Sequence, residues 1–169
     1  YDCQPINRLD WLVEGLMLFS KHKSAEKELF KLSQAKKITK GYLALTTHQT
    51  KSILKVKNTL KFKHRAECCD HGKLATTWFL KVDDYNDFSI YRAILSAGKR
   101  HQIRFHASLK LSPLVGDYFY NSSYKTPLKE VGLIADSLTF WWKNKRYKIN
   151  LPQSMTIIYK LADNVISKY

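Results

Sequence analysis

The residues best placed to do chemistry are an acid and a base near the start of the chain, Asp10 and Arg8, with Leu9 between them. Residues two apart in an extended chain point to the same side, so both side chains can face one pocket. A surface ion pair would also explain the spacing, since exposed pairs contribute only about 0–1 kcal/mol and need no function. Asp10 is the candidate reactive group, and the segments that follow it decide between the two interpretations.

Charge and composition narrow the class of protein. The 169 residues include 29 Lys and Arg against 14 Asp and Glu, a net charge of +15. A chain of this length can bury the core of one domain, and its excess positive charge favours a polyanionic partner such as RNA. A basic surface that is only solvated is the alternative. No apolar stretch approaches the roughly 18 residues of a membrane span, so we expect no membrane partner.

The cysteines indicate neither a disulfide scaffold nor a metal site. Cys3, Cys68 and Cys69 are an odd number, and two of them are adjacent. Asp70 and His71 follow directly, but structural zinc sites space their ligands by roughly two to four residues and add a second pair elsewhere. We therefore expect no metal and a reducing, cytoplasmic compartment.

Periodicity and helix end signals predict the elements that must position Asp10. The run from Leu16 to Ser20 indicates a buried strand. A helix follows, with Ser24 as its N-cap and Lys36 and Lys37 in its last turn. A short helix is expected over 102–109 and a C-terminal one from Met155 to Lys168. Further strands are expected over 42–47, 75–82, 88–95, 133–135, 138–142 and 145–151.

Strands outnumber helices in this pattern, which predicts an α+β fold with a mixed, mostly antiparallel sheet flanked by short helices and loops. Residues 48–73 are polar and basic, and Val56, Leu60 and Phe62 alternate with the charges, as in a surface β-hairpin. This hairpin either contacts phosphates or is merely solvated. Its basic residues include Lys51, Lys55, Lys57, Lys61, Lys63, His64 and Arg65.

Five short motifs stand in order along the chain. They are Arg8-Leu9-Asp10 with Gly15, Lys40-Gly41-Tyr42, Ala75-Thr76-Thr77, Gly98-Lys99-Arg100-His101-Gln102-Ile103-Arg104, and Pro113-Leu114-Val115-Gly116-Asp117 with Tyr120. From Ile6 to about Phe140 the chain resembles the RluA-type pseudouridine synthases, which isomerise uridines in ribosomal or transfer RNA. The family pattern is His-Arg-Leu-Asp with Thr-Ser-Gly, Lys-x-Tyr, Gly-Arg-x-His-Gln-Ile/Leu-Arg and Pro-x-x-Gly-Asp. Each motif is modest, and their order carries the resemblance.

The resemblance implies an enzyme without metal or organic cofactor, whose substrate uridine is flipped out of its stack. It implies a catalytic Asp10, a Tyr42 that contacts the target base, and an Arg104 that holds Asp10 by a salt bridge. The expected substrate-binding residues are Arg8, Lys99, Arg100, His101, Gln102 and Leu133.

Each of these substrate-binding residues has an expected task. Arg8 would fill the gap left by the flipped nucleotide or hold that nucleotide, and Lys99 with Arg100 would hold phosphates. For His101 and Gln102, hydrogen bonds to RNA and bracing of their own loop are equally good explanations. The resemblance places Leu133 in the apolar pocket lining.

Several positions depart from the family pattern. Asn7 stands in place of His, Val13-Glu14 in place of Thr-Ser, Lys99 in place of Arg, and Ile134 where a His is common. The family's strands before Arg-Leu-Asp are not in this sequence, and neither is an S4-like RNA-binding domain. We therefore expect 1–169 to be a single, N-terminally truncated catalytic domain that acts as a monomer.

Two other functions are kept as alternatives. One is an RNA-binding protein that retains the fold but has weak or no catalysis. The other is a generic basic domain that binds DNA, for which an acid at position 10 would have no use. An intact Asp10, Tyr42 and Arg104 favour the enzyme over both.

Overall fold

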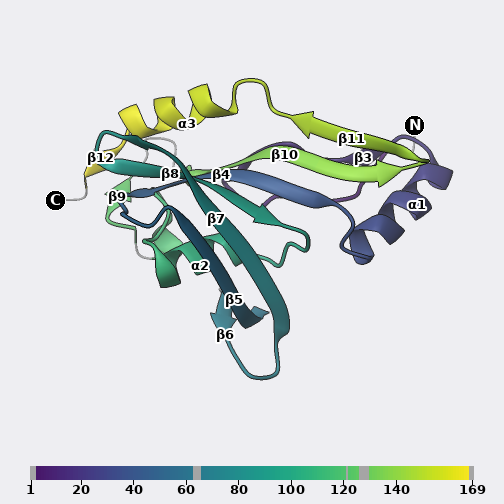
Figure 1. Cartoon of the computed structure of the whole chain (residues 1–169), viewed down its shortest axis with the longest axis horizontal. Helices are drawn as coiled ribbons and strands as arrows, with labels where there is room; N and C mark the ends of the chain where they lie inside the picture. Colours follow the sequence, from purple (N-terminus) through teal and green to yellow (C-terminus); the bar gives the residue numbers. More distant parts are fainter. Residues whose placement is uncertain (1–2, 63–65, 121, 126–129, 168–169) are drawn as a thin grey trace.

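The structure is a computed structural model that describes residues 3–62, 66–120, 122–125 and 130–167. Within these residues an eight-stranded sheet has the order β11-β10-β4-β8-β7-β5-β6, and β2 pairs with β10 beside this path (Figure 1). Its strands are β2 (Glu14–Gly15), β4 (Thr39–Thr47), β5 (Ile53–Phe62), β6 (Ala66–Cys68), β7 (Lys73–Tyr85), β8 (Phe88–Leu95), β10 (Leu133–Trp142) and β11 (Lys145–Asn150). Among the described strands of this sheet, only β2 and β10 pair in parallel. The predicted α+β class and mixed, mostly antiparallel sheet are confirmed.

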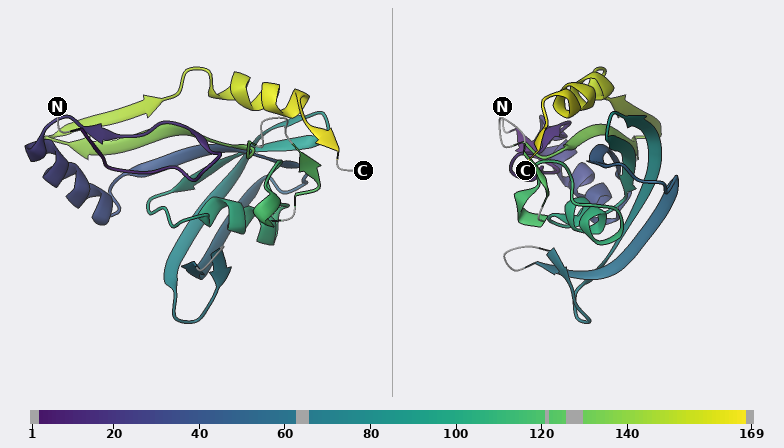
Figure 2. Two further views of the ribbon diagram at one scale, coloured as in Figure 1. Left: turned by 180° about the vertical axis from the view of Figure 1, so that it is seen from behind. Right: turned by 90° about the vertical axis from the view of Figure 1, so that its left-hand side faces the viewer.

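Helices cover both faces of this sheet. They are α1 (Lys23–Gln34), α2 (Gln102–Lys110) and α3 (Ser154–Asp163). α2 and α3 lie on opposite faces, and the side view in Figure 2 shows the sheet curving around α2. In β4, Tyr42 and Ala44 pack on the α2 side, whereas Leu43 and Leu45 pack on the α3 side. Burial on both faces explains why this strand is an unbroken apolar run instead of an alternating one.

Two small sheets and a short helix complete the description. β1 (Gln4–Pro5) pairs with β3 (Phe19–Ser20), β9 (Tyr124–Lys125) pairs with β12 (Ile166–Ser167), and Tyr118–Tyr120 forms a 3-10 helix. The β1–β3 pair matters for the site, because it closes the loop that carries Asp10.

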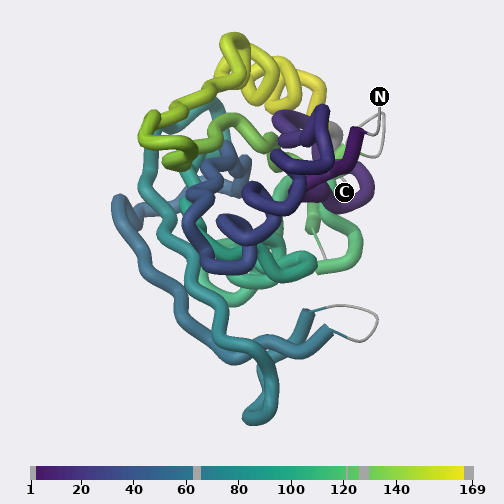
Figure 3. Tube along the Cα trace, turned by 90° about the vertical axis from the view of Figure 1, so that its right-hand side faces the viewer, coloured from purple at the N-terminus to yellow at the C-terminus, as the bar shows by residue number. Residues whose placement is uncertain are grey.

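The basic segment at 48–73 has different partners from those predicted. β5 pairs with β7 over Ile53–Leu60, and only its last residues, 60–62, pair with β6. These strands form an arm that projects from the body (Figure 3). A hairpin is therefore present within 48–73, but it is short, because the main partner of β5 is β7, which lies beyond the next turn. Lys63, His64 and Arg65 lie outside the described residues.

Predicted ends of elements were also wrong in places. Residues 16–18 are not strand, because the partner strand β1 is only two residues long and contains Pro5, which has no N–H to donate. α1 follows His22 without a side-chain cap, so Ser24 lies inside the helix. It ends before Lys36, whose left-handed backbone (φ 57°) stops it.

The predicted C-terminal helix was too long. α3 ends at Asp163, and the next residues pair with β9 instead of continuing the helix. Lys168, its predicted last residue, lies outside the described residues.

A buried ion pair fastens α2 to the turn at 113–117. Arg104 is 4% exposed and Asp117 is fully buried. Arg104 donates from Nε to Asp117 Oδ2 and from Nη2 to Oδ1, both at 2.7 Å. Two parallel bonds of this kind fix the plane of the guanidinium as well as its position. The orientation of Arg104 is therefore set before any substrate binds.

Replacing Asp117 by Ala should destabilise the fold strongly, because it leaves the buried Arg104 charge without its main partner. We expect the free energy of unfolding, measured by urea titration, to fall by about 3–5 kcal/mol. Asp70→Ala removes an exposed carboxylate and should change it by less than about 0.5 kcal/mol. Equal unfolding midpoints for Asp117→Ala and Asp70→Ala would contradict the role given to this pair.

Candidate active site

A cavity of about 230 Å³ lies between the Asp10 loop, β4, the segment before α2 and the start of β10. Seven of the residues predicted to form the site line it: Arg8, Asp10, Tyr42, Lys99, Arg100, Gln102 and Leu133. The other two, His101 and Arg104, are buried beside Asp10. The structure thus brings together all nine predicted residues from four separate segments.

The loop that carries Asp10 is closed at its base. The side-chain oxygen of Asn7 accepts a hydrogen bond from the Leu18 N–H at 2.7 Å, and the Val13 N–H donates to the Asp10 carbonyl at 3.1 Å. Asn7 is itself buried. The residue that departs from the family pattern here therefore has a structural task, because it ties the two ends of the loop together.

Gly15 attaches the same loop to the sheet. It pairs with Ala135 in the parallel β2–β10 contact, and its φ of +122° is one that L side chains rarely adopt. A Cβ at this position would overlap the carbonyl group of Ala135. Only glycine allows the loop to approach β10 closely enough to put Asp10 beside Leu133 and Tyr42.

Burial and charge act in opposite directions on Asp10. Burial raises the pKa of Asp10 above its ordinary 3.8, and this is the largest effect. The Arg104 guanidinium, the backbone N–H of His101, and the charges of Arg8 and Arg100 oppose it and favour the carboxylate. The Arg104 Nη1 atom lies 3.9 Å from Asp10 Oδ2. Asp10 is thus partly removed from water and surrounded by donors and cations that favour its carboxylate form.

Two nitrogens of Arg104, Nε and Nη2, donate to Asp117, so only Nη1 is directed toward Asp10. That nitrogen, Nη1, also lies 2.9 Å from Nε2 of His101. Burial, followed by the Arg104 charge, lowers the pKa of His101 to about 4, so the ring is neutral near pH 7 and Nε2 accepts from Arg104. The predicted salt bridge from Arg104 to Asp10 is therefore longer than the two bonds from Arg104 to Asp117, and Asp117 is the main partner of Arg104.

Sequence reasoning missed Asp117 as part of the site. It appeared only as the last residue of a turn motif, and its burial opposite an arginine is a tertiary fact. The available signal was its place in an otherwise apolar turn, Pro113 to Val115 and Gly116, where a solvent-exposed carboxylate would be unexpected.

His101 has a second contact with Asp10 through its backbone. The residue adopts a left-handed conformation, with φ 55° and ψ 16°. This conformation is uncommon outside glycine and immediately precedes α2. From it the N–H of His101 donates to the Asp10 carboxylate. Such backbone conformations are found where a functional group has to be aimed.

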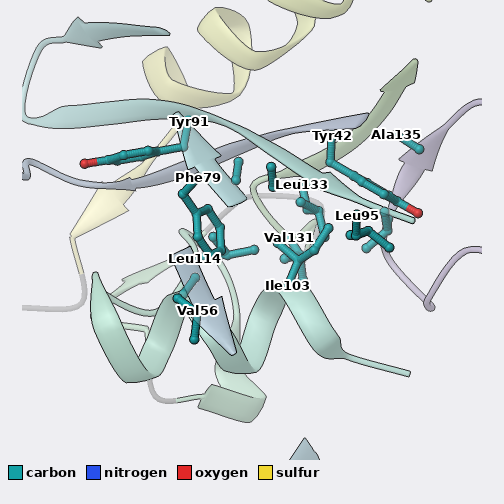
Figure 4. Close-up of a cluster of buried hydrophobic side chains, with 14 residues drawn as sticks. Tyr42, Val56, Phe79, Tyr91, Leu95, Ile103, Leu114, Val131, Leu133 and Ala135 are labelled. Carbon is teal, nitrogen blue, oxygen red and sulfur yellow. The ribbon is translucent and has the colours of Figure 1, made fainter. Parts of the chain in front are cut away.

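Tyr42 and Lys40 alternate with Gly41 on β4, so both face the cavity. The Tyr42 ring lies beside Leu95 and Leu133, and its hydroxyl points away from the rest of the cluster (Figure 4). Burial, with the nearby Asp10 charge, raises the pKa of Tyr42 to about 12. Tyr42 is therefore a neutral hydroxyl at physiological pH. Burial also lowers the pKa of Lys40, a wall residue to which sequence reasoning gave no role.

Gln102 is fully occupied by protein partners. Its Oε1 accepts from the Lys99 N–H at 3.0 Å, and its Nε2 lies within 3.0 Å of both Thr76 O and Thr77 Oγ1. Of the two tasks considered for Gln102, these bonds favour bracing of the loop against β7. In the Ala75-Thr76-Thr77 motif, Thr76 and Thr77 supply the oxygens that accept these bonds from Gln102.

The mouth of the cavity is basic. Arg8 and Arg100 are exposed, and the Arg100 guanidinium stacks 4.0 Å from the ring centre of Phe62, the last residue of β5. Burial lowers the pKa of Lys99, and the charges of Lys73 and Lys36 add to the effect. The positive charges of these lysines repel one another, and a bound polyanion would relieve that repulsion.

In the described part of the chain, no group of three or more His, Cys, Asp or Glu side chains could hold a metal ion. Likewise, no described helix is long and apolar enough to cross a membrane.

Known proteins resemble this chain in sequence. A ribosomal large subunit pseudouridine synthase D of Blochmanniella floridana is 32% identical over 124 residues, covering 70% of this chain and 39% of its own length. An uncharacterized RNA pseudouridine synthase of Helicobacter pylori is 31% identical over 183 aligned positions, covering 96% of this chain and 61% of its own. The chain thus spans about two to three fifths of the length of these curated relatives.

Solved structures share the fold. Human RNA Pseudouridylate Synthase Domain Containing 4 superimposes with a TM-score of 0.76 at 16% identity, covering 99% of this chain and 78% of the other. Domain Containing 1 gives 0.73 at 20% identity, covering 89% and 69%. The predicted pseudouridine synthase fold is confirmed. The family model for RNA pseudouridylate synthase matches residues 1–109, well over half of the chain, and the chain therefore belongs to that family.

Proposed function

We propose that this protein is an RNA pseudouridine synthase that isomerises specific uridines, with ribosomal RNA as the first substrate to test. The observation that carries the proposal is the position of Asp10 in the cavity wall, facing Tyr42 and held by Arg104. The cavity is somewhat smaller than the roughly 300–1,000 Å³ of pockets for drug-sized ligands. A cavity of this size can take the uracil base of one flipped uridine.

The reaction breaks the C1′–N1 bond of uridine and joins C5 of the same base to C1′. The proton on C5 is lost and N1 gains one, so the reaction needs neither redox chemistry nor an external group. Positive charge develops at C1′ when the first bond breaks, as in glycoside hydrolysis. The Asp10 carboxylate would lie beside this carbon, where it can stabilise the charge or add to C1′.

Tyr42 is suited to handle the base. Its ring packs against apolar neighbours and can lie along the uracil, and its hydroxyl can relay the proton lost from C5. A pKa of about 12 keeps that hydroxyl protonated, so it donates a hydrogen bond and passes a proton on only when an acceptor such as Asp10 takes one.

Arg104 is a positioning residue in this scheme. Asp117 fixes its guanidinium, and Nη1 then keeps Asp10 ionised and in place. On the exposed side, Arg8 would occupy the space left by the flipped nucleotide, while Lys99 and Arg100 would hold the flanking phosphates.

Asp10→Ala in the full-length gene should abolish pseudouridine formation and leave RNA affinity within a few-fold. Carbodiimide-blocked primer extension on cellular RNA, with and without the gene, measures the first, and filter binding measures the second. The matched control is Glu14→Gln, which removes an exposed carboxylate of β2. Supplied to cells that lack the gene, this variant should restore every pseudouridine that the wild-type gene restores. Turnover by Asp10→Ala would remove Asp10 from its role. If no site depends on the gene, the protein is an RNA binder that has kept the fold.

Tyr42→Phe should lower turnover by about 10²–10⁴-fold, because it keeps the ring and removes only the hydroxyl. Single-turnover formation of pseudouridine on a mapped RNA measures this effect. Tyr147→Phe makes the same change on β11, away from the cavity, and should have wild-type turnover. Equal rates for the two variants would mean that the Tyr42 hydroxyl takes no part.

Activity should fall on the acid side at a pH above 3.8, because burial raises the pKa of Asp10 and only the carboxylate is active. The Arg8 charge lowers that pKa, so Arg8→Gln should move the acid limb of kcat/KM to higher pH. Lys57→Gln removes one charge from the arm and should leave the limb in place. A limb that moves to lower pH in Arg8→Gln would show that Asp10 is not the group that titrates.

A further inference from the structure

The end of the β10–β11 hairpin carries a basic and aromatic surface for which the proposed reaction has no use. Five exposed side chains form this hairpin patch: Trp141, Lys143, Lys145, Arg146 and Lys148. From Asp136 to Asp163 the sequence contains no other acidic residue. The patch is therefore a local excess of positive charge with no intervening carboxylates along the chain.

Aromatic rings and cations are paired on both faces of this hairpin. Trp141 is 62% exposed and lies directly opposite Arg146. On the other face, the Nζ atoms of Lys143 and Lys145 lie 5.0 and 5.5 Å from the ring centres of Trp142 and Tyr147. Trp142 is partly engaged, since its Nε1 donates to Glu28 at 2.6 Å. Trp141 is thus the ring that is open to a ligand.

The hairpin presents these groups rigidly. Lys143 and Asn144 at its tip have φ values of 49° and 60°, as the tight two-residue turn that matches strand twist requires. The strands are paired over six residue pairs from Ser137 to Trp142. A ligand therefore meets a preformed surface and does not have to order a loop.

Protection of the sheet edge explains only part of the patch. β11 is an edge strand, and lysines on such strands prevent pairing with other chains. An exposed tryptophan has the opposite effect, because its large apolar surface favours association. Trp141 among cations is instead the combination that binds single-stranded nucleic acid, in which bases stack on rings and phosphates meet lysines.

We propose that the hairpin patch binds the RNA strand that flanks the target uridine, as a second contact outside the cavity. The proposal rests on the proposed function for the position of the target in the cavity. β10 links the two places, since it begins at Leu133 in the cavity wall and ends at Trp142. At about 3.3 Å per residue this separates them by roughly 30 Å, which about nine stacked nucleotides would span.

The test compares short and long RNA. Fluorescein-labelled oligouridylates of 6 and 18 nucleotides are titrated with full-length protein, and affinity is read from anisotropy at two salt concentrations. One variant combines Lys145→Gln, Arg146→Gln and Lys148→Gln, and a second is Trp141→Ala. The charge-matched control combines Lys110→Gln, Lys125→Gln and Lys160→Gln, exposed lysines on α2, β9 and α3 toward the opposite end of the molecule (Figure 1).

For the 18-mer we expect the patch triple variant to lose at least about tenfold in affinity, with a flatter salt dependence, and Trp141→Ala at least about fivefold. Both should bind the 6-mer within about twofold of wild type, since six stacked nucleotides at about 3.4 Å each span only about 20 Å, short of the roughly 30 Å between cavity and hairpin. The control should lose less than about threefold with either RNA. Wild-type affinity of the patch variants for the 18-mer, or an equal loss in the control, would overturn the proposal. Binding needs no turnover, so an inactive enzyme would leave this result readable.

Discussion

The guanidinium of Arg104 is the group around which the site is assembled. A buried arginine is tolerated only when its donors are paired, and here the partners come from three parts of the chain. Asp117 takes two of its nitrogens, and the third lies near both His101 and Asp10. The turn after α2, the start of α2 and the N-terminal loop must therefore meet at one point. The Asp10 carboxylate is held in place by the same requirement that makes the core stable.

The sheet supplies the fixed floor for this assembly. Alternation along β4 sends Leu43 and Leu45 into the α3 layer, while Lys40 and Tyr42 face the cavity. A one-residue slip would exchange the two faces of β4, putting Leu43 and Leu45 into the cavity wall and Tyr42 into the α3 layer, so its register is firmly specified. The position of the Tyr42 hydroxyl relative to Asp10 follows from packing on the far side of the sheet.

Local signals in the sequence identified much of this arrangement. Alternating and apolar runs predicted the strands near 75–82 and 88–95, and helical spacing gave a helix over 102–109 that the structure extends by one residue. Ordered motifs brought Asp10 and Tyr42 into one site. These features are encoded by neighbouring residues, so a single sequence reveals them.

The features that were missed depend on partners far along the chain. Nothing close to β5 shows that its main partner is β7, and nothing in the turn at 113–117 shows that Asp117 is buried against Arg104. The buried strand predicted from Leu16 fails for the same reason, because the length of β1 limits it. Tertiary contacts override local preference in each case.

The parallel contact between Gly15 and Ala135 also sets the order in which the domain can form. Its two residues are more than a hundred positions apart, and at about 5–20 residues per second a ribosome needs roughly 6–24 s to synthesise the chain between them. Until β10 emerges, the Asp10 loop has no strand to join and the cavity lacks a wall. A nascent chain released before that point carries Asp10 but lacks the β10 wall of the cavity, so the cavity can assemble only after β10 has been synthesised.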